Sequence, residues 1–280
     1  MRLTVSTHSF EVLNLDGTLA IAKSMGFKGV DIAGFHNRGK CSYEPDQVAA
    51  APQKFADDLK RHLEKYELEA VDYYPQFGSS PDERSINDPD PTVRQKTFDA
   101  MRGNAQFCKL AGVPGITVLP GVDHPGRSLE QNLKLAGEGM KRWVDVCGEA
   151  GIMLRFEPHM GSVAQTPETA LALIEMAPGA LVTLDYSHFV LQYIPVERIH
   201  KLIPHTGHVH VRPARPGKLQ TRYIENTIDW ADVIRRLKDS GYKYCVSIEY
   251  IYSDWFDLNQ CDTLAETLIT KAALDPYISV

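Results

Sequence analysis

Short runs of apolar, β-branched and aromatic residues alternate along the chain with longer stretches in which apolar residues recur every three or four positions. The short runs predict β-strands, and the longer stretches predict helices that bury one face. The strands recur about once every 35 residues, which is the size of a βα unit. The predicted strands are Leu3–Ser6, Gly29–Ile32, Ala70–Tyr74, Ile116–Leu119, Met153–Glu157, Val182–Asp185, His208–Val211 and Cys245–Glu249.

Several helix ends carry recognisable signals. The segment Ser128–Gln131 has the pattern of a capping box, and an amphipathic stretch follows it. Thr166 and Pro167 are typical of the N-cap and first residue of the next helix. Gly241 is expected to end the helix Asp229–Ser240 before the last strand.

The regular alternation predicts an α/β fold, a single (β/α)8 TIM barrel that spans residues 1–280 as one domain. No Pro/Gly/Ser-rich linker divides the chain, and the glycine signatures of open nucleotide-binding sheets are absent from it. Longer segments follow the second strand (Phe35–Pro52) and the third (Gln76–Pro91). A barrel places such segments at the C-terminal rim of its strands, where active sites lie.

Four metal-binding residue types fall at the ends of the last four predicted strands, about one βα unit apart: Glu157, Asp185, His210 and Glu249. Side chains alternate between the two faces of a strand, and the neighbours of these four are apolar. Those neighbours suit the outer face, where helices pack. The four polar side chains are therefore expected to point into the barrel at one height.

Three carboxylates buried together need a cation, because an unpaired buried charge is very costly. Three oxygen donors and one imidazole suit one divalent metal, with Mn²⁺ favoured and Mg²⁺, Co²⁺ and Zn²⁺ also compatible. The alternative is an ion-pair cluster with Arg155, which shares the inward face of Glu157. We favour the metal, because packing needs alone do not explain four matching strand ends.

The order of these motifs resembles the xylose-isomerase-like TIM barrels, a superfamily of sugar and sugar-phosphate isomerases and epimerases, inosose dehydratases and, more distantly, endonuclease IV enzymes. The motifs are Glu157-Pro-His, Asp185-x-x-His188, His210 on strand seven, Glu249 on strand eight, Gly-Phe-Lys-Gly-Val-Asp at 26–31 and Thr-Ile-Asp-Trp at 227–230. The resemblance spans essentially the whole chain.

This resemblance implies that Glu157, Asp185, His210 and Glu249 hold the metal, and that Glu157 and Glu249 are the catalytic residues. One would remove a proton next to a ketone and the other would return it, through an enediolate. The implied activity is isomerisation or epimerisation of a keto-sugar or related polyol. A lyase that dehydrates an inosose or keto-sugar acid shares the first step and stays open as the alternative.

Five residues are candidates for substrate binding, each with a purely structural alternative. His188 follows Asp185 at the rim, and we expect it to contact a substrate hydroxyl or carbonyl. His159 and His8 lie near strand ends and are as readily structural. Arg212 and Arg215 follow strand seven, and the resemblance calls for one arginine there without deciding which. Val163 stands where related epimerases place an acidic residue.

The formal net charge of −6 disfavours a nucleic-acid partner. The predicted ends of strands three and four also lack the additional histidines that an endonuclease IV-like nuclease needs. No apolar run is long enough to cross a membrane, and the five scattered cysteines suggest reduced thiols in a cytoplasmic enzyme. A non-catalytic sugar-binding barrel remains the last alternative. Aromatic residues near the rim are consistent with a homodimer.

Overall fold

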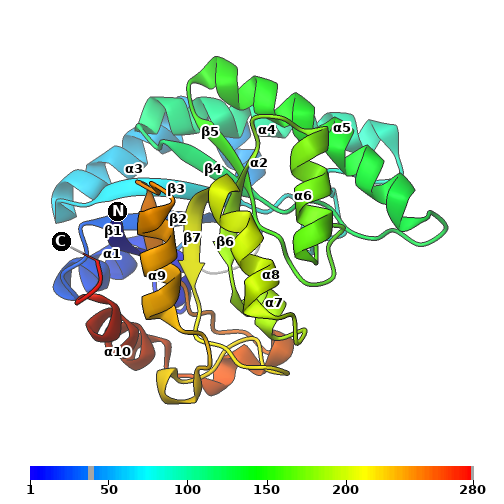
Figure 1. The fold of residues 1–280 in the computed structure, drawn as a ribbon. Coiled ribbons are helices and arrows are strands. Elements are labelled where there is room, and N and C mark those ends of the chain that lie inside the picture. Colours follow the sequence, from blue (N-terminus) through cyan, green and yellow to red (C-terminus); the bar gives the residue numbers. More distant parts are fainter. Residues whose placement is uncertain (37–40, 279–280) are drawn as a thin grey trace.

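A computed structural model describes residues 1–36 and 41–278 and shows parallel strands closed into a barrel in chain order (Figure 1). The strands that form this barrel are β1 (Arg2–Ser6), β2 (Gly29–Gly34), β3 (Glu69–Pro75), β4 (Gly115–Val118), β5 (Met153–Phe156), β6 (Leu181–Asp185), β7 (Thr206–Val211) and β8 (Cys245–Ile248). Parallel pairing between β8 and β1 closes the ring. The fold is therefore the predicted (β/α)8 TIM barrel.

Helices connect the strands and surround the barrel. The α-helices are α1 (Leu15–Ser24), α2 (Pro45–Ala50), α3 (Pro52–Tyr66), α4 (Pro91–Ala111), α5 (Leu129–Ala150), α6 (Pro167–Met176), α7 (Ser187–Val190), α8 (Val196–Ile199), α9 (Trp230–Asp239) and α10 (Thr263–Leu274). Short 3₁₀ helices are η1 (Thr7–Phe10), η2 (His200–His205), η3 (Tyr223–Glu225) and η4 (Trp255–Gln260). The arrow of β7 points towards the side of the barrel where the loops after β7 and β8 lie (Figure 1).

The local signals in the sequence are confirmed. Ser128 and Gln131 form a reciprocal capping box at the start of α5. Thr166 caps α6, and Pro167 is its first residue. The helix before β8 is two residues shorter than predicted, because Asp229 and Ser240 are its caps rather than helical residues. In the predicted segment Phe35–Pro52, residues 37–40 lie outside the described part of the chain, and α2 follows them.

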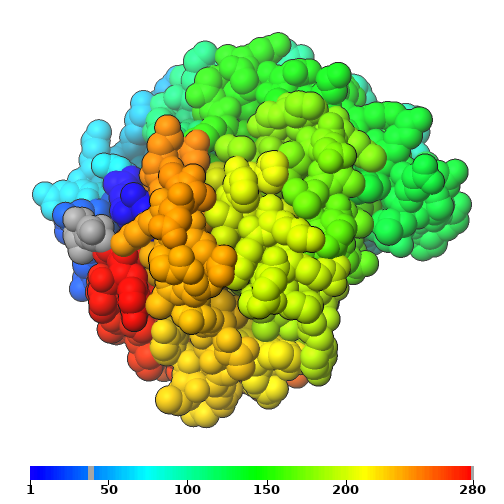
Figure 2. All heavy atoms as spheres, viewed as in Figure 1, coloured from blue at the N-terminus to red at the C-terminus, as the bar shows by residue number. Residues whose placement is uncertain are grey.

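The apolar core is a ring between the barrel wall and the helices. Outward-facing Leu184, Val209 and Ile248 are fully buried, together with helix residues such as Leu19 and Leu59. In the space-filling view, atoms of α6, α9 and α10 cover much of the wall (Figure 2). No helix in the described residues is both long and apolar enough to span a bilayer.

Polar pairs occupy the barrel interior, where branched apolar residues are usual. Arg155 on β5 donates a 2.6 Å hydrogen bond to Asp72 on β3. Thr117 and Thr183 share a 2.6 Å hydrogen bond between β4 and β6. Gly115 makes room for this interior, because a Cβ there would overlap with the Arg155 guanidinium. Polar and charged pairs thus occupy the inside of the barrel, and the apolar ring between the barrel wall and the helices supplies the hydrophobic stabilisation.

Candidate metal centre

Strand β7 and the residue after it send basic side chains into the barrel at alternate positions: His208, His210 and Arg212. Each meets a carboxylate from another part of the barrel. The pairs are His208–Asp31 at 2.8 Å, His210–Glu157 at 2.7 Å and Arg212–Glu249. Period-two alternation on one strand therefore builds a ladder of buried pairs between basic and acidic side chains, which extends to the C-terminal rim.

At the upper end of this ladder, single ligand atoms of Glu157, Asp185, His210 and Glu249 all lie within 4.8 Å of one another. The four side chains are buried and come from β5, β6, β7 and β8 or the residues directly after them. Asp185 Oδ2 is buried and has no hydrogen-bond partner among the described residues. Converging oxygen donors with a free lone pair and one imidazole fit a divalent cation.

The pKa values of these groups are shifted by their mutual contacts. Burial acts to raise the pKa of Glu157, but the adjacent His210 outweighs it and lowers that pKa well below the usual range. Burial acts to lower the pKa of His210, yet Glu249 and Glu157 raise it well above its ordinary value. Burial raises the pKa of Asp185 to about 6, although Arg212 opposes the shift. The cluster thus carries concentrated negative charge that attracts protons or a metal.

Arg155 is not the cation of this cluster, because its guanidinium binds Asp72 lower in the barrel. Arg212 takes that place instead. It is buried, it forms a close ion pair with Glu249, and its Nη1 lies 3.4 Å from Asp185 Oδ2. One arginine offsets only part of the charge of three carboxylates, so the cluster retains capacity for a metal ion.

A cavity of about 330 Å³ opens directly above the cluster. Its walls come from the C-terminal ends of the eight barrel strands and the segments after them. They include Glu157, Glu249, Arg212, His8, His159, His188, Tyr74, Gln76, Leu119 and Trp255. This volume falls in the range of small-molecule sites. The predicted catalytic pair, Glu157 and Glu249, is therefore brought to one cavity together with His8, His159, His188 and Arg212.

His188 is more deeply placed than a rim residue, because it is buried beside the cluster. Its Nε2 lies 3.8 Å from Asp185 and 3.4 Å from Arg212 Nη1. Burial lowers the pKa of His188 well below its ordinary value, so the ring is neutral. Its ring also contacts His159, which in turn stacks on Trp255 at 5.5 Å between centroids. The two histidines and the tryptophan form one side of the cavity.

Arg215 does not belong to the cavity. Its side chain is exposed and contacts the carbonyl of the neighbouring Pro216. The choice between the two arginines after β7 thus falls on Arg212. His8 lines the cavity from η1, and its Nε2 lies 3.1 Å from Glu11.

Two further contacts were not anticipated from the sequence. The Tyr74 hydroxyl donates a 3.1 Å hydrogen bond to Glu157 Oε2. The Ser6 hydroxyl donates a 3.2 Å hydrogen bond to Glu249 Oε1. Both donors lie at inward positions near strand ends. The alternation of side chains along a strand predicts that they point into the barrel, but it does not predict their partners.

The sequence profile of the xylose isomerase-like TIM barrel family matches residues 19–274, which is most of the chain. The chain belongs to the xylose isomerase-like TIM barrel family. Among curated proteins, this barrel is similar to the inosose dehydratase of Geobacillus kaustophilus (strain HTA426), with 25% identity over 145 residues. That match covers 51% of the chain and 46% of the dehydratase, so it spans less than half of that relative's length.

Solved structures of the same shape include two that bear on this xylose isomerase-like barrel. D-psicose 3-epimerase from Clostridium cellulolyticum H10, solved with D-tagatose, superposes with a TM-score of 0.76 at 16% identity, covering 99% of this chain and 98% of the epimerase. The IolI protein with a bound zinc atom superposes with a TM-score of 0.74 at 18% identity, covering all of both chains. At these identities the likeness establishes the fold.

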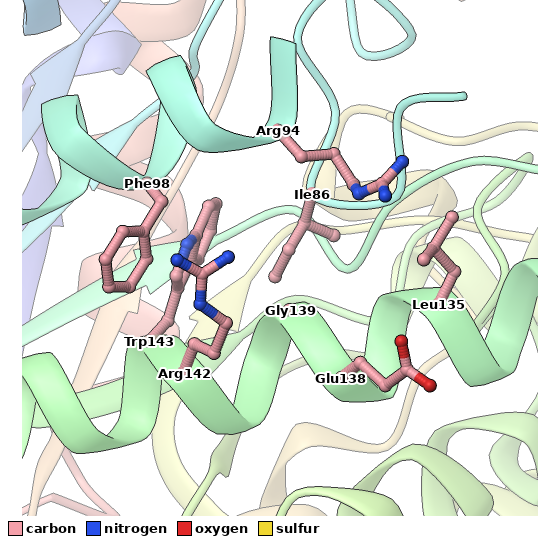
Figure 3. Close-up of a pocket in the computed structure, with 8 residues that line it drawn as sticks. All are labelled: Ile86, Arg94, Phe98, Leu135, Glu138, Gly139, Arg142 and Trp143. Atoms are coloured by element: carbon pink, nitrogen blue, oxygen red, sulfur yellow. The ribbon is translucent and has the colours of Figure 1, made fainter. Parts of the chain in front are cut away.

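A second hollow of this xylose isomerase-like barrel, about 140 Å³ in volume, lies between α4 and α5 on the outside (Figure 3). Phe98 and Arg142 lie side by side there, with the guanidinium carbon 3.8 Å from the ring centroid. Arg142 also donates to Gln95. Its cationic group is therefore already satisfied by the ring and the amide, and the hollow lacks the convergent carboxylates of the barrel mouth.

Proposed function

We propose that this chain is a divalent-metal-dependent isomerase or epimerase of a keto-sugar or related polyol. The observation that carries the proposal is the position of two carboxylates, Glu157 and Glu249, around one imidazole nitrogen. His210 Nδ1 lies 2.7 Å from Glu157 Oε1 and 3.5 Å from Glu249 Oε2, and both carboxylates line the cavity. Two bases at one small-molecule cavity suit the removal and return of a proton at a carbon atom.

The metal would be held by Glu157, Asp185, His210 and Glu249, with Mn²⁺ as our first choice. When bound, it would supply the positive charge that acidifies the C–H bond beside a substrate carbonyl. The zinc atom in the IolI structure makes Zn²⁺ the natural second choice.

The remaining roles belong to the side chains of this chain. Glu157 is ionised at neutral pH, because its pKa is lowered, and it accepts the substrate proton although the same shift makes it a weaker base. Glu249 returns a proton to the same carbon. Neutral His188 offers its buried Nδ1, which has no partner among the described residues, to a substrate hydroxyl or carbonyl. Arg212, His159 and His8 bind further oxygen atoms of the sugar, and Trp255 packs against its ring face.

A dehydratase is the second candidate, and the similarity to inosose dehydratase favours it. Both reactions begin when a proton is taken from the carbon beside a carbonyl. They differ in the second step, because the epimerase returns the proton while the lyase expels a hydroxyl group as water. Glu249 would then protonate that leaving group.

One experiment separates these functions. The protein is stripped with a chelator, reloaded with Mn²⁺ or Zn²⁺, assayed for bound metal, and incubated in D₂O with keto-hexoses and inososes. Metal-dependent uptake of deuterium beside the carbonyl without loss of water supports the proposal. Loss of water from the substrate identifies a lyase. Binding without any exchange identifies a sugar-binding barrel. A parallel incubation of the same metal-loaded protein with abasic DNA tests for a nuclease, which would cleave it.

A further inference from the structure

The carboxylate of Asp31 lies beneath the metal-ligand cluster, between the two imidazoles of β7. Its Oδ2 is 2.8 Å from His208 Nε2 and 3.5 Å from His210 Nε2. All three side chains are almost fully buried, and Asp31 does not line the cavity. A carboxylate in such a place is stable only if its neighbours supply hydrogen bonds or charge.

The ring of His210 joins Asp31 to the cluster. Nδ1 faces the carboxylates of Glu157 and Glu249, whereas Nε2 faces Asp31. An imidazole binds a metal through a nitrogen lone pair, so the proton of the neutral ring must then sit on the other nitrogen. Coordination through Nδ1 therefore requires a proton on Nε2, and Asp31 is the acceptor that faces it.

We infer that Asp31 is a positioning residue of the metal centre, which accepts a hydrogen bond from the Nε2–H of His210 and so directs Nδ1 towards the carboxylates of Glu157 and Glu249. His208 holds Asp31 in place from below through the shorter of the two contacts. The inference rests on the metal-binding part of the proposed function. It adds a carboxylate outside the ligand set, in the way that metal-binding histidines are commonly fixed through their second nitrogen.

Asp72 provides a matched control. It is the register partner of Asp31 on the neighbouring strand, and it is equally buried. Its carboxylate, however, binds Arg155 and not His210. Loss of the Asp72 charge thus perturbs the barrel interior at the height of Asp31. It leaves the Asp31 carboxylate in place as the hydrogen-bond acceptor for His210.

The test compares Asp31→Ala, Asp31→Asn and Asp72→Asn with the unmodified protein. Calorimetric titration with Mn²⁺ gives the affinity, the visible absorption of bound Co²⁺ reports the ligand geometry, and thermal unfolding reports stability. For Asp31→Ala we expect Mn²⁺ binding to weaken by about 10–100-fold and the Co²⁺ bands to shift. Asp31→Asn, which keeps an acceptor oxygen, should show a smaller loss. Asp72→Asn should unfold earlier but bind Mn²⁺ normally.

Unchanged Mn²⁺ affinity and Co²⁺ bands in folded Asp31→Ala would overturn the inference. If the alanine variant does not fold, unchanged Mn²⁺ affinity and Co²⁺ bands in Asp31→Asn would overturn it instead. Equal losses of affinity in Asp31→Asn and Asp72→Asn would also overturn it, because the effect would then be general to the barrel interior. If the unmodified protein binds neither Mn²⁺ nor Co²⁺, the proposed metal centre itself fails. The two failures are therefore distinguishable.

Discussion

Tyr74 donates a 3.1 Å hydrogen bond to Oε2 of Glu157, while the other oxygen of the same carboxylate faces His210. Both oxygens of the proposed base are thereby engaged before any substrate enters. Burial raises the pKa of the Tyr74 phenol well above its ordinary value, so the hydroxyl is a reliable donor at neutral pH. The orientation of Glu157 therefore depends on a residue of β3, a strand that does not pair with β5.

Tyr74→Phe removes this donor and leaves the ring. We expect deuterium exchange to slow by about tenfold or more, since a hydrogen bond to a charged group contributes roughly 1.5–3 kcal/mol. Exchange rates at saturating metal and substrate measure the effect. Tyr73→Phe is the matched control, because the neighbouring phenol bonds Asn104 on the outer side of the sheet. Equal effects of the two changes would contradict the assigned role.

Glu157→Gln and Glu249→Gln each remove a proposed base but keep the side-chain volume. Each should lower the exchange rate by about 10²–10⁴-fold at saturating metal, which is the usual contribution of a general acid or base. Circular dichroism checks that the fold persists. Glu168→Gln is the control, since Glu168 pairs with Arg198 on the exposed surface and should leave the rate unchanged. Full activity in either active-site variant would refute the mechanism.

Arg212→Lys tests the arginine of the cavity. A lysine cannot reach Glu249 and Asp185 together as the planar guanidinium does, so kcat/KM should fall by about tenfold or more. Arg215→Lys makes the same change on the exposed loop and should alter neither kcat/KM nor stability beyond about 0.5 kcal/mol. Steady-state kinetics and thermal unfolding of both variants give the comparison. A larger effect at Arg215 would reverse the assignment.

Metal affinity should rise with pH. Burial raises the pKa of Asp185 to about 6. A ligand must lose its proton to bind metal, so protons compete with Mn²⁺ below that pH, and the raised pKa of His210 extends the competition above it. Calorimetry between about pH 5 and about pH 8, repeated in buffers of different ionisation enthalpy, measures both affinity and proton release. Affinity that does not change with pH would contradict the ligand set.

The same shift predicts the stability of the metal-free protein. The folded pKa of Asp185 lies above its unfolded value of 3.8. Its stabilising contribution is therefore fully present below about pH 4 and is lost as pH rises through about 6. Asp185→Asn should remove this part of the slope when unfolding is followed by denaturant titration. An unchanged slope would assign the pH dependence to other groups.

The sequence was sufficient to predict the barrel and the four strand-end residues, because strand parity depends only on the local period of the chain. Parity also offered Arg155 as the cation in the alternative to a metal, but Arg155 pairs with Asp72 lower in the barrel. The contacts between interior side chains depend on how the strands are staggered when the barrel closes. The sequence of a single strand does not determine that stagger. The contacts of Tyr74 with Glu157 and of Asp31 with His210 could not be predicted from the sequence for the same reason.

The sequence left Arg212 and Arg215 as alternatives for a different reason. Arg212 continues the alternation of β7 by one more step, so its inward direction follows from the strand. Arg215 lies beyond Pro213 in a turn stabilised by its own hydrogen bonds to Lys218. Once the backbone leaves the strand, sequence spacing no longer predicts direction.

The position of the apolar ring outside the barrel wall determines which parts of this protein can be redesigned. The apolar ring lies outside the strands, and the residues that line the cavity do not belong to it. Cavity-lining side chains such as Trp255 can therefore be exchanged to accept other ligands while the barrel itself stays intact. The basic side chains of β7 have no such freedom, since each of them is paired with a carboxylate from another strand or from the residue directly after it. Redesign of specificity should therefore begin with the loops and leave the strand interior unchanged.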